Sequence, residues 1–287
     1  MRWRGRRGSG NVEDRRGSGR ISPRGTALGG VGGVGVVIIL LLIILAGGDP
    51  TTVVNQQGVP QDDLSQSQQD ESERFVSVVL ADTEDVWGRQ FRQMDREYRQ
   101  PTLVLYTGYV SSACGTTSSA VGPFYCPIDE KIYLDLKFFQ ELRDRFGAPG
   151  DFAAAYVIAH EVGHHIQNQL GIMDAVSARQ QRVSQAEANR LSVRLELQAD
   201  FLAGVWAHNA DKSLGVVEAG DIAEALTAAD AIGDDRLQME SRGFIVPDSF
   251  THGTSAQRMH WFRLGYETGD LSRGDTFSRP SLQLPGG

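Results

Sequence analysis

The chain has 287 residues, of which 40% are hydrophobic and 22% are charged. This length can bury a substantial core in one or two domains, and the composition excludes both a disordered chain and a polytopic membrane protein. The net charge of −8 is unevenly placed: residues 1–48 hold eight Arg against Glu13 and Asp14, a net charge of +6, and the rest holds 20 basic against 34 acidic residues, a net charge of −14. An acidic body argues against nucleic acid as the main partner, because duplex binding requires a cationic face.

The first 48 residues predict a membrane anchor. Residues 25–48 contain no charged side chain, and this run of 24 exceeds the ~20 residues that a helix needs to cross a bilayer. A buried core helix and a cleaved signal peptide are the alternatives, and the flanking Arg24 and Asp49 together with the length of the apolar run disfavour both. We expect one transmembrane helix at 25–48, a basic cytoplasmic tail at 1–24, and residues 49–287 outside the cytoplasm, as in a single-pass protein of the cell membrane.

After the apolar run, the sequence predicts a polar, flexible linker at 49–70 and one domain at 71–287. The domain is expected to be of the α+β class, mostly helical, with a small antiparallel or mixed sheet before a central helix. In chain order, the expected elements are a helix at 71–99 (interrupted, if anywhere, near Gly88), strands at 103–106 and 131–134, helices at 136–146, 152–170 with Asp151 as N-cap, 174–209, 221–239 and 255–268, and a loose tail at 271–287.

The chain contains two cysteines, Cys114 and Cys126, both after the apolar run. In the oxidising compartment that the predicted topology implies, they are expected to form a disulfide. By the loop-closure model, closing this loop removes roughly 3 kcal/mol of chain entropy from the unfolded state. A zinc site built on the two cysteines is less favoured, because their spacing, without a nearby His, is not that of zinc ligands.

The strongest chemical signal lies in the predicted central helix, where residues 160–164 read H-E-V-G-H. Four residues make about one helical turn, so His160 and His164 face the same side and can hold one metal ion, while Glu161 can reach a water there without being a ligand. The preceding turns are apolar, and buried His and Glu would be costly without a ligand, which disfavours a solvated helix face. His165 points about 100° away around the helix and is expected to be a packed or surface side chain.

Two histidines leave a tetrahedral zinc site in need of a third protein ligand. Glu196 is the preferred choice, and Asp200, four residues later on the same predicted helix, is expected to orient one of the imidazoles. Apolar neighbours argue against a solvated face for these two carboxylates. Glu187, His208 and Glu224 stay open as alternative third ligands.

With these residues in place, the chain resembles the "putative neutral zinc metallopeptidase" family, membrane-anchored bacterial proteins of the zincin group. The resemblance covers nearly the whole chain and implies a zincin-like fold. The spacing of Glu196 and Asp200 is that of the gluzincins, in which the Glu ligates zinc and the Asp supports a ligand His. The segments that carry the resemblance, besides the apolar run, are 4–7, 11–17, 122–127, 133–135, 160–165, 196–200 and 251–258.

A second resemblance gives His252 a role. Residues 252–258 are similar to the H-P-x-x-x-x-R element of membrane-bound prenyl-protein endopeptidases, whose His helps to stabilise the oxyanion, except that Gly253 stands where those proteins have Pro. The local alternatives are that His252 caps the helix at 255–268 and that Arg258 is a structural salt-bridge partner.

Together these expectations describe a membrane-anchored, zinc-dependent endopeptidase with one Zn²⁺ per chain. Zinc held by His160, His164 and Glu196 would activate a water, Glu161 would act as the general base, and His252 would stabilise the oxyanion.

The expected partner is a peptide or an unfolded protein substrate. In zincins the extended substrate pairs with an edge strand above the active helix, and the best match here is strand 131–135, with Ile132, Tyr133 and Leu134. The alternative function is a zinc-stabilised binding or scaffolding protein outside the cytoplasm, without peptidase activity. A structural zinc site, however, prefers four protein ligands.

Overall fold

The computed structural model describes residues 1–16 and 64–278. Its strands are β1 (Val12–Asp14), β2 (Thr102–Tyr106), β3 (Tyr109–Ser112), β4 (Gly115–Ser118), β5 (Phe124–Cys126) and β6 (Lys131–Asp135). The central sheet has the strand order β1-β2-β6-β5, in which β1, β2 and β6 run parallel and β5 is antiparallel to β6. A separate antiparallel hairpin pairs β3 with β4.

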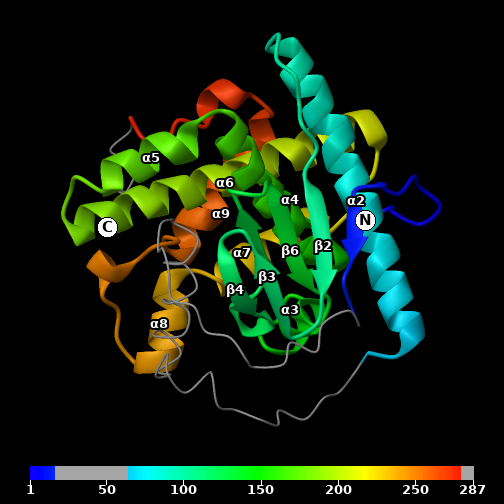
Figure 1. Cartoon of the computed structure of the whole chain (residues 1–287), viewed down its shortest axis with the longest axis horizontal. Helices are drawn as coiled ribbons and strands as arrows, with labels where there is room; N and C mark the ends of the chain where they lie inside the picture. Colours follow the sequence, from blue (N-terminus) through cyan, green and yellow to red (C-terminus); the bar gives the residue numbers. More distant parts are fainter. Residues whose placement is uncertain (17–63, 279–287) are drawn as a thin grey trace.

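Helices supply most of the remaining structure. In chain order they are α2 (Gln66–Gln93), α3 (Phe138–Asp144), α4 (Asp151–Gln169), α5 (Ile172–Gln180), α6 (Gln185–Leu214), α7 (Asp221–Ala231), α8 (Asp234–Arg242) and α9 (Ser255–Thr268), with 3-10 turns at Ser119–Val121, Pro247–Ser249 and Leu271–Arg273. Helix α4 contacts β5, β6, α2, α6 and α7, and therefore lies at the centre of the fold (Figure 1).

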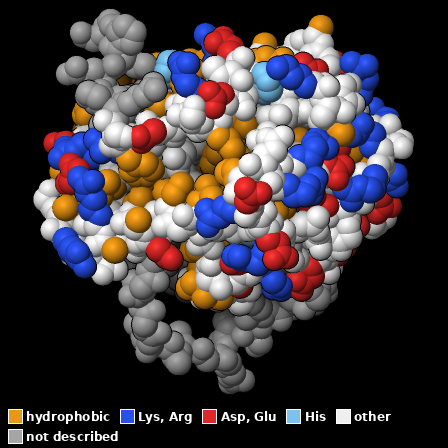
Figure 2. All heavy atoms as spheres, turned by 90° about the horizontal axis from the view of Figure 1, so that it is seen from above, with side chains coloured by type: hydrophobic (Ala, Val, Ile, Leu, Met, Phe, Trp, Pro, Cys, Tyr) orange, Lys and Arg blue, Asp and Glu red, His pale blue; other side chains and the backbone are white. Residues whose placement is uncertain are grey.

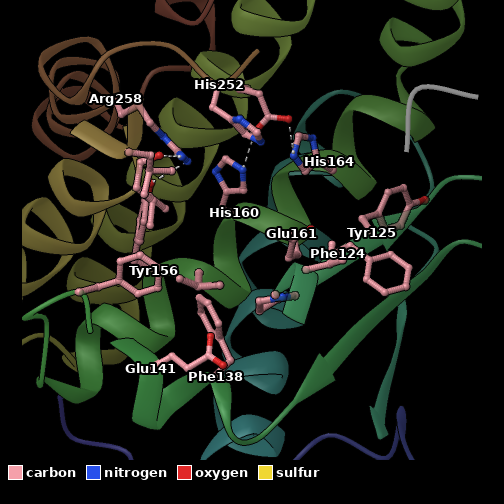
Figure 3. A pocket seen from close by; sticks show the side chains of 18 of the residues that line it. Phe124, Tyr125, Phe138, Glu141, Tyr156, His160, Glu161, His164, His252 and Arg258 are labelled. Carbon is pink, nitrogen blue, oxygen red and sulfur yellow. Dashed lines mark hydrogen bonds and ion pairs between the residues drawn. The ribbon is translucent and has the colours of Figure 1, made fainter. Parts of the chain in front are cut away.

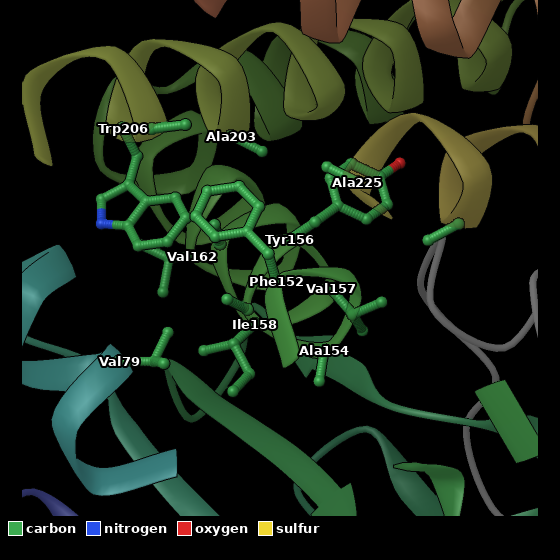
Figure 4. Close-up of a cluster of buried hydrophobic side chains, with 14 of the residues drawn as sticks. Val79, Phe152, Ala154, Tyr156, Val157, Ile158, Val162, Ala203, Trp206 and Ala225 are labelled. Atoms are coloured by element: carbon green, nitrogen blue, oxygen red, sulfur yellow. The ribbon is translucent and has the colours of Figure 1, made fainter. Parts of the chain in front are cut away.

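Helix α4 is apolar over most of its length because it is buried on all sides, from residue 152 to residue 167. Figure 4 shows its side chains, among them Ile158, between Val79 of α2 and Trp206 of α6. The ring of Phe152 stacks on that of Trp206, with 5.8 Å between the centroids. Each fully buried apolar side chain stabilises the fold by about 1.5–3 kcal/mol, so the helix that carries the H-E-x-x-H motif is firmly held.

Helices α6 and α9 approach so closely that their backbones touch. A Cβ atom added to Gly204 would lie 2.1 Å from the carbonyl oxygen of Phe262, and one added to Gly265 would lie 2.1 Å from that of Phe201. Only glycine fits at such a crossing. This contact fixes the position of α9, and with it Arg258, relative to α6.

Several predicted elements agree with the structure, and others need correction. The strands at 103–106 and 131–134 and the helix at 255–268 are present. The first long helix begins inside the predicted linker, because Ser65 and Gln68 form a capping box there, and it continues through Gly88 without a break. At α4 the N-cap is Gly150, and Asp151 is the first helical residue.

Two predicted helical stretches are each divided in the structure. The stretch at 174–209 consists of α5 and α6, because Ser184 starts a new helix by accepting a hydrogen bond from the backbone of Glu187. The stretch at 221–239 consists of α7 and α8, which meet at Gly233. The predicted loose tail also packs in part: Gln198 donates a hydrogen bond to the carbonyl oxygen of Gly274.

The predicted fold class is correct in one part and wrong in another. The chain is a mostly helical α+β protein with small sheets. The prediction of a preceding transmembrane helix is not supported: within residues 1–16 and 64–278, no helix has both the length and the apolar character needed to cross a bilayer. The predicted span at 25–48 lies outside the described residues, as does the linker up to residue 63.

Residues 1–16 are part of the folded domain, although the sequence predicted them as a separate cytoplasmic tail. Trp3 is buried and its ring meets that of Phe75 edge to face, with 5.5 Å between the centroids. Strand β1 extends the sheet by pairing with β2. Segments that pack together lie on the same side of any membrane, so this part of the predicted topology does not fit the structure. The location at the cell membrane stays a prediction.

Of the arginines that predicted a membrane topology, Arg4, Arg6, Arg7 and Arg16 form ion pairs with α2. Arg6 lies 2.7 Å from Asp82, and Arg7 lies 2.9 Å from Asp85. Arg7 also lies 3.6 Å from Glu84, and further pairs join Arg4 to Glu71 and Arg16 to Glu73. On the face of the molecule shown in Figure 2, basic and acidic side chains are likewise interspersed. The clustered Arg residues therefore have a structural role in attaching residues 1–16 to the domain.

We predict that the double substitution Gly8→Cys, Ser77→Cys produces a disulfide in the full chain as it is made in cells. A Cβ atom on Gly8 would lie 3.5 Å from the Cβ atom of Ser77, which is within the range of about 3.5–4.5 Å found in disulfides. Mass spectrometry of the proteolysed, unreduced protein should detect the linked peptides. Gly10→Cys with Ser77→Cys is the control, because a Cβ atom on Gly10 has no neighbour within 4 Å. Two thiols that react with maleimide but do not cross-link would show that residues 1–16 are not docked.

Candidate metal centre

Helices α4 and α6 bring together His160, His164 and Glu196, all buried, with one potential ligand atom of each lying within 4.8 Å of the others. His160 Nε2 lies 3.1 Å from Glu196 Oε2, and His164 Nε2 lies 3.5 Å from Glu196 Oε1. The helices can approach because the H-E-V-G-H motif contains Gly163. A Cβ atom there would lie 3.0 Å from the carbonyl oxygen of Ala199.

The donor set fits a zinc ion. Burial works against the charged form of Glu196, but His164 and His160 hold the pKa of this carboxyl group well below its usual value, so it offers an anionic oxygen. Two imidazole nitrogens and one carboxylate oxygen are the ligands of catalytic zinc sites, which leave a fourth position open. All three side chains also line a cavity, so that position is accessible.

The alternative third ligands lie elsewhere and have other partners. Glu187 is paired with Arg190. His208 Nδ1 lies 2.6 Å from the carbonyl oxygen of Tyr266. Glu224 accepts a hydrogen bond from the backbone nitrogen of Phe152, at the start of α4. The structure therefore leaves Glu196 as the carboxylate that joins the two histidines.

Asp200 holds His160 in position. Its Oδ1 atom lies 2.8 Å from His160 Nδ1 and accepts a hydrogen bond from the Tyr156 hydroxyl group at 2.6 Å. Arg258 donates to both carboxylate oxygens, at 2.9 and 3.0 Å. Burial alone would raise the pKa of Asp200, but Arg258 and His160 outweigh it and lower this pKa to about 2. An ionised Asp200 keeps the Nδ1 proton on His160 and leaves Nε2 free for a metal ion.

His164 is oriented by a neighbour on its own helix. Its Nδ1 atom lies 2.9 Å from the side-chain oxygen of Gln167. The amide nitrogen of Gln167 in turn donates to the carbonyl oxygen of Leu195, at 2.7 Å, and to Gln198, at 3.1 Å. Gln167 thereby links the second histidine to α6, the helix that carries Glu196.

Glu161 lies beside the first histidine in the wall of the cavity (Figure 3). It is 8% exposed. Burial raises the pKa of Glu161, and the nearby His164 and His160 offset this shift only in part. A carboxylate with a raised pKa accepts a proton more readily than an ordinary one, which suits a general base.

His252 reaches the same cavity from the loop before α9 (Figure 3). Asp234 fixes this loop: its Oδ2 atom accepts hydrogen bonds from the backbone nitrogens of Thr251, His252 and Gly253, at 2.7, 2.6 and 3.0 Å. Its Oδ1 atom lies 3.2 Å from His252 Nδ1. Burial lowers the pKa of His252, but Asp234 outweighs this effect and raises it. His252 can therefore present a proton on its other nitrogen.

The loop geometry separates His252 from its alternative role as a helix cap. Thr254 is the N-cap of α9 and forms a capping box with Gln257. Gly253 has a φ angle of +93°, a conformation that proline cannot adopt. The departure from the H-P-x-x-x-x-R element therefore has a structural reason: this loop takes a course that only glycine readily permits.

The cavity in front of these residues has a volume of about 220 Å³. Residues 120–125, α3 and α4 form much of its wall, and Phe124 and Phe138 line it (Figure 3). A mostly apolar cleft with a few convergent polar groups is typical of a substrate site.

The predicted substrate strand needs correction. Ile132, Tyr133 and Leu134 belong to β6, which pairs with β2 on one side and with β5 on the other, and each is 1% exposed. An interior strand has no free edge for a peptide. The edge strands of this sheet are β1 and β5, and residues Phe124 and Tyr125 of β5 line the cavity.

The disulfide between Cys114 and Cys126 is confirmed, and Cys114 contributes to the cavity wall.

His165 is a packed side chain, as predicted. It is fully buried, its Nδ1 atom lies 3.0 Å from the Tyr125 hydroxyl group, and its Nε2 atom lies 2.6 Å from the carbonyl oxygen of Arg99.

Sequence reasoning missed three residues that support the site. Tyr156 lies four residues before His160, and Gln167 three residues after His164, so helical spacing could have found both. No such signal pointed to Asp234, because only the folded chain brings it to His252.

A mostly helical α+β fold in which an H-E-x-x-H helix faces a Glu and an Asp one turn apart defines a protein of the zinc metallopeptidase class. The chain belongs to the family described as "Putative neutral zinc metallopeptidase", whose model matches residues 1–277. It is 51% identical over 286 residues to the protein YpfJ of Escherichia coli K12, covering 97% of this chain and 99% of that protein. It is 42% identical over 252 residues to Rv2575 of Mycobacterium tuberculosis, covering 82% and 84%. No solved structure matches the chain.

We predict that Asp200→Asn weakens zinc binding by about 10- to 100-fold, because His160 loses the charged partner that orients it. It should also lower the free energy of unfolding by about 3–5 kcal/mol, because the buried guanidinium of Arg258 loses its ion pair. Adding Arg258→Met should restore much of the stability but not the affinity. Chelator competition and denaturant unfolding measure the two effects. Wild-type zinc affinity in Asp200→Asn would contradict the assigned role.

Proposed function

We propose that this chain is a zinc-dependent endopeptidase that hydrolyses peptide bonds in extended or unfolded polypeptides. The observation that carries the proposal is the convergence of His160, His164 and Glu196 at the wall of an open, mostly apolar cavity, with Glu161 beside them. Membership of a family described as zinc metallopeptidases agrees with it.

The ligands of the zinc ion would be His160, His164 and Glu196. When bound, the ion supplies Lewis acidity, which makes a water more acidic and polarises a carbonyl group. The side chains of the protein perform the proton transfers. Glu161, with its raised pKa, takes the proton of the attacking water and passes it to the leaving amine.

His252 would donate a hydrogen bond to the oxyanion that develops on the scissile carbonyl. Asp234 positions it for this by binding Nδ1 and three consecutive backbone nitrogens of its loop. A donor held in place before the reaction stabilises developing charge without reorganisation, which is the main source of oxyanion stabilisation in enzymes.

The substrate backbone would bind along β5, the strand at the edge of the sheet beside the cavity. Backbone hydrogen bonds to an edge strand recognise extended chain rather than one particular side chain. The disulfide between Cys114 and Cys126 joins the last residue of β5 to the turn between β3 and β4, and so holds this edge in place.

The alternative is a zinc-stabilised binding or scaffolding protein. A structural zinc site is closed by four protein ligands, whereas three converge here next to a cavity that also contains Glu161 and His252. Chelator-sensitive cleavage of a denatured protein by the full chain distinguishes the two functions, because a scaffold would bind zinc without cleaving.

We predict that Glu161→Gln keeps zinc but lowers kcat on a denatured protein substrate by at least about 10²-fold, because the general base is lost. His160→Ala should lose both zinc and activity. Metal analysis and a fluorescent-casein assay measure the two properties. The control is Glu187→Gln, since Glu187 lies on α6 away from the site. Full activity of Glu161→Gln would refute the assignment of the base.

We also predict that His252→Ala lowers kcat by about 10²- to 10³-fold and leaves KM and zinc content unchanged, because its hydrogen bond forms only in the transition state. His252→Gln should recover part of the rate, since an amide can also donate. His260→Ala, which removes an exposed histidine on α9, serves as the control. Equal losses in kcat and in zinc content would indicate a purely structural role for His252.

A further inference from the structure

Helix α3 lines the cavity with an apolar surface and one carboxylate. Phe138 and Glu141 lie close together at one end of the cavity, beyond Tyr156 and away from His164 and His252 (Figure 3). Phe146, just after the helix, completes this apolar wall. These residues are separate from the metal centre, and none of them takes part in the proposed hydrolysis.

Glu141 is half-buried and has no close cationic partner. Among residues 1–16 and 64–278, its carboxylate forms no hydrogen bond and no ion pair within 4.0 Å. Burial raises the pKa of Glu141, and Arg145 offsets this only in part. Arg145 also lines the cavity, but its guanidinium lies over the ring of Phe146, 5.0 Å from the centroid, and the residue is exposed, so water screens its charge.

An unpaired carboxylate in an apolar wall favours one kind of ligand. An uncharged apolar side chain placed there would displace the remaining water from the carboxylate of Glu141 without replacing the hydrogen bonds of that water, which costs free energy. An acidic side chain would be repelled. The side chains of Lys and Arg combine an apolar stem with a cationic end, and so match both parts of the surface.

We propose that this end of the cavity binds a Lys or Arg side chain of the peptide substrate, with its methylene groups against Phe138 and Phe146 and its charge at Glu141. This inference rests on the proposed peptidase function and assigns that function a substrate class: peptides with a basic residue near the scissile bond. Glu141 is then a specificity-determining residue.

The first test compares peptides that differ only in Lys or norleucine, which share the apolar stem and differ in charge. The zinc-loaded full chain should cleave the Lys peptides about 10-fold or more faster, measured as kcat/KM, after a peptide library has located the sensitive position. Glu141→Gln should abolish the preference, so that the Lys and norleucine peptides are cleaved with similar kcat/KM. Asp144→Asn is the matched control, because Asp144 lies on the same helix, is exposed and does not line the cavity.

A binding measurement separates this inference from the proposed function. In the Glu161→Gln background, calorimetry should show the Lys peptide binding about 10-fold or more tightly than the norleucine peptide, and Glu141→Gln should remove the difference. If no peptide is cleaved but this difference is present, the peptidase function fails and the recognition site stands. If norleucine serves as well as Lys in cleavage and binding, or Glu141→Gln keeps the preference, the inference is overturned. Absence of both cleavage and binding overturns both.

Discussion

The site depends on the contact between α4 and α6 at Gly163. Two imidazoles one turn apart on α4 face two carboxylates one turn apart on α6, and a helical turn advances both helices by the same ~5.4 Å. The register of the two helices therefore pairs Glu196 with the Nε2 atoms of both histidines and Asp200 with Nδ1 of His160. Any side chain at residue 163 would push the helices apart at this level, since its Cβ atom would meet the backbone of Ala199.

Charge balance explains why so many ionisable groups can be buried together. Asp200 is neutralised by Arg258, whose guanidinium binds both carboxylate oxygens; Arg258 lines the cavity, whereas Asp200 is fully buried beside His160. Glu196 lines the cavity and is available as a ligand for the metal ion. The direct backbone contact between α6 and α9 at Gly204 and Gly265 holds Arg258 in place, so the ion pair of Arg258 with Asp200 belongs to the core of the fold. The catalytic groups that line the cavity can then gain or lose charge without disturbing the ion pair of Asp200 with Arg258.

The sequence predicted the parts of the site that follow local rules. Helical periodicity was enough to place His160, Glu161 and His164 on one helix and to pair Glu196 with Asp200. It was not enough for β6, which has the composition of a strand but whose interior position depends on pairing with β5, a strand of only three residues. The arginines of residues 1–16 were misinterpreted for a similar reason: their acidic partners on α2 are more than fifty residues away in the chain. Long-range pairing carries no signal in one sequence.

The most direct measurement is zinc X-ray absorption spectroscopy on the purified full chain, combined with elemental analysis. The account predicts one zinc per chain, with about two imidazole ligands, oxygen in the remaining positions at about 2.0–2.2 Å and no sulfur. The Glu196→Ala variant should bind zinc much more weakly. A protein that binds no zinc, or a zinc ion enclosed by four protein ligands, would contradict the account.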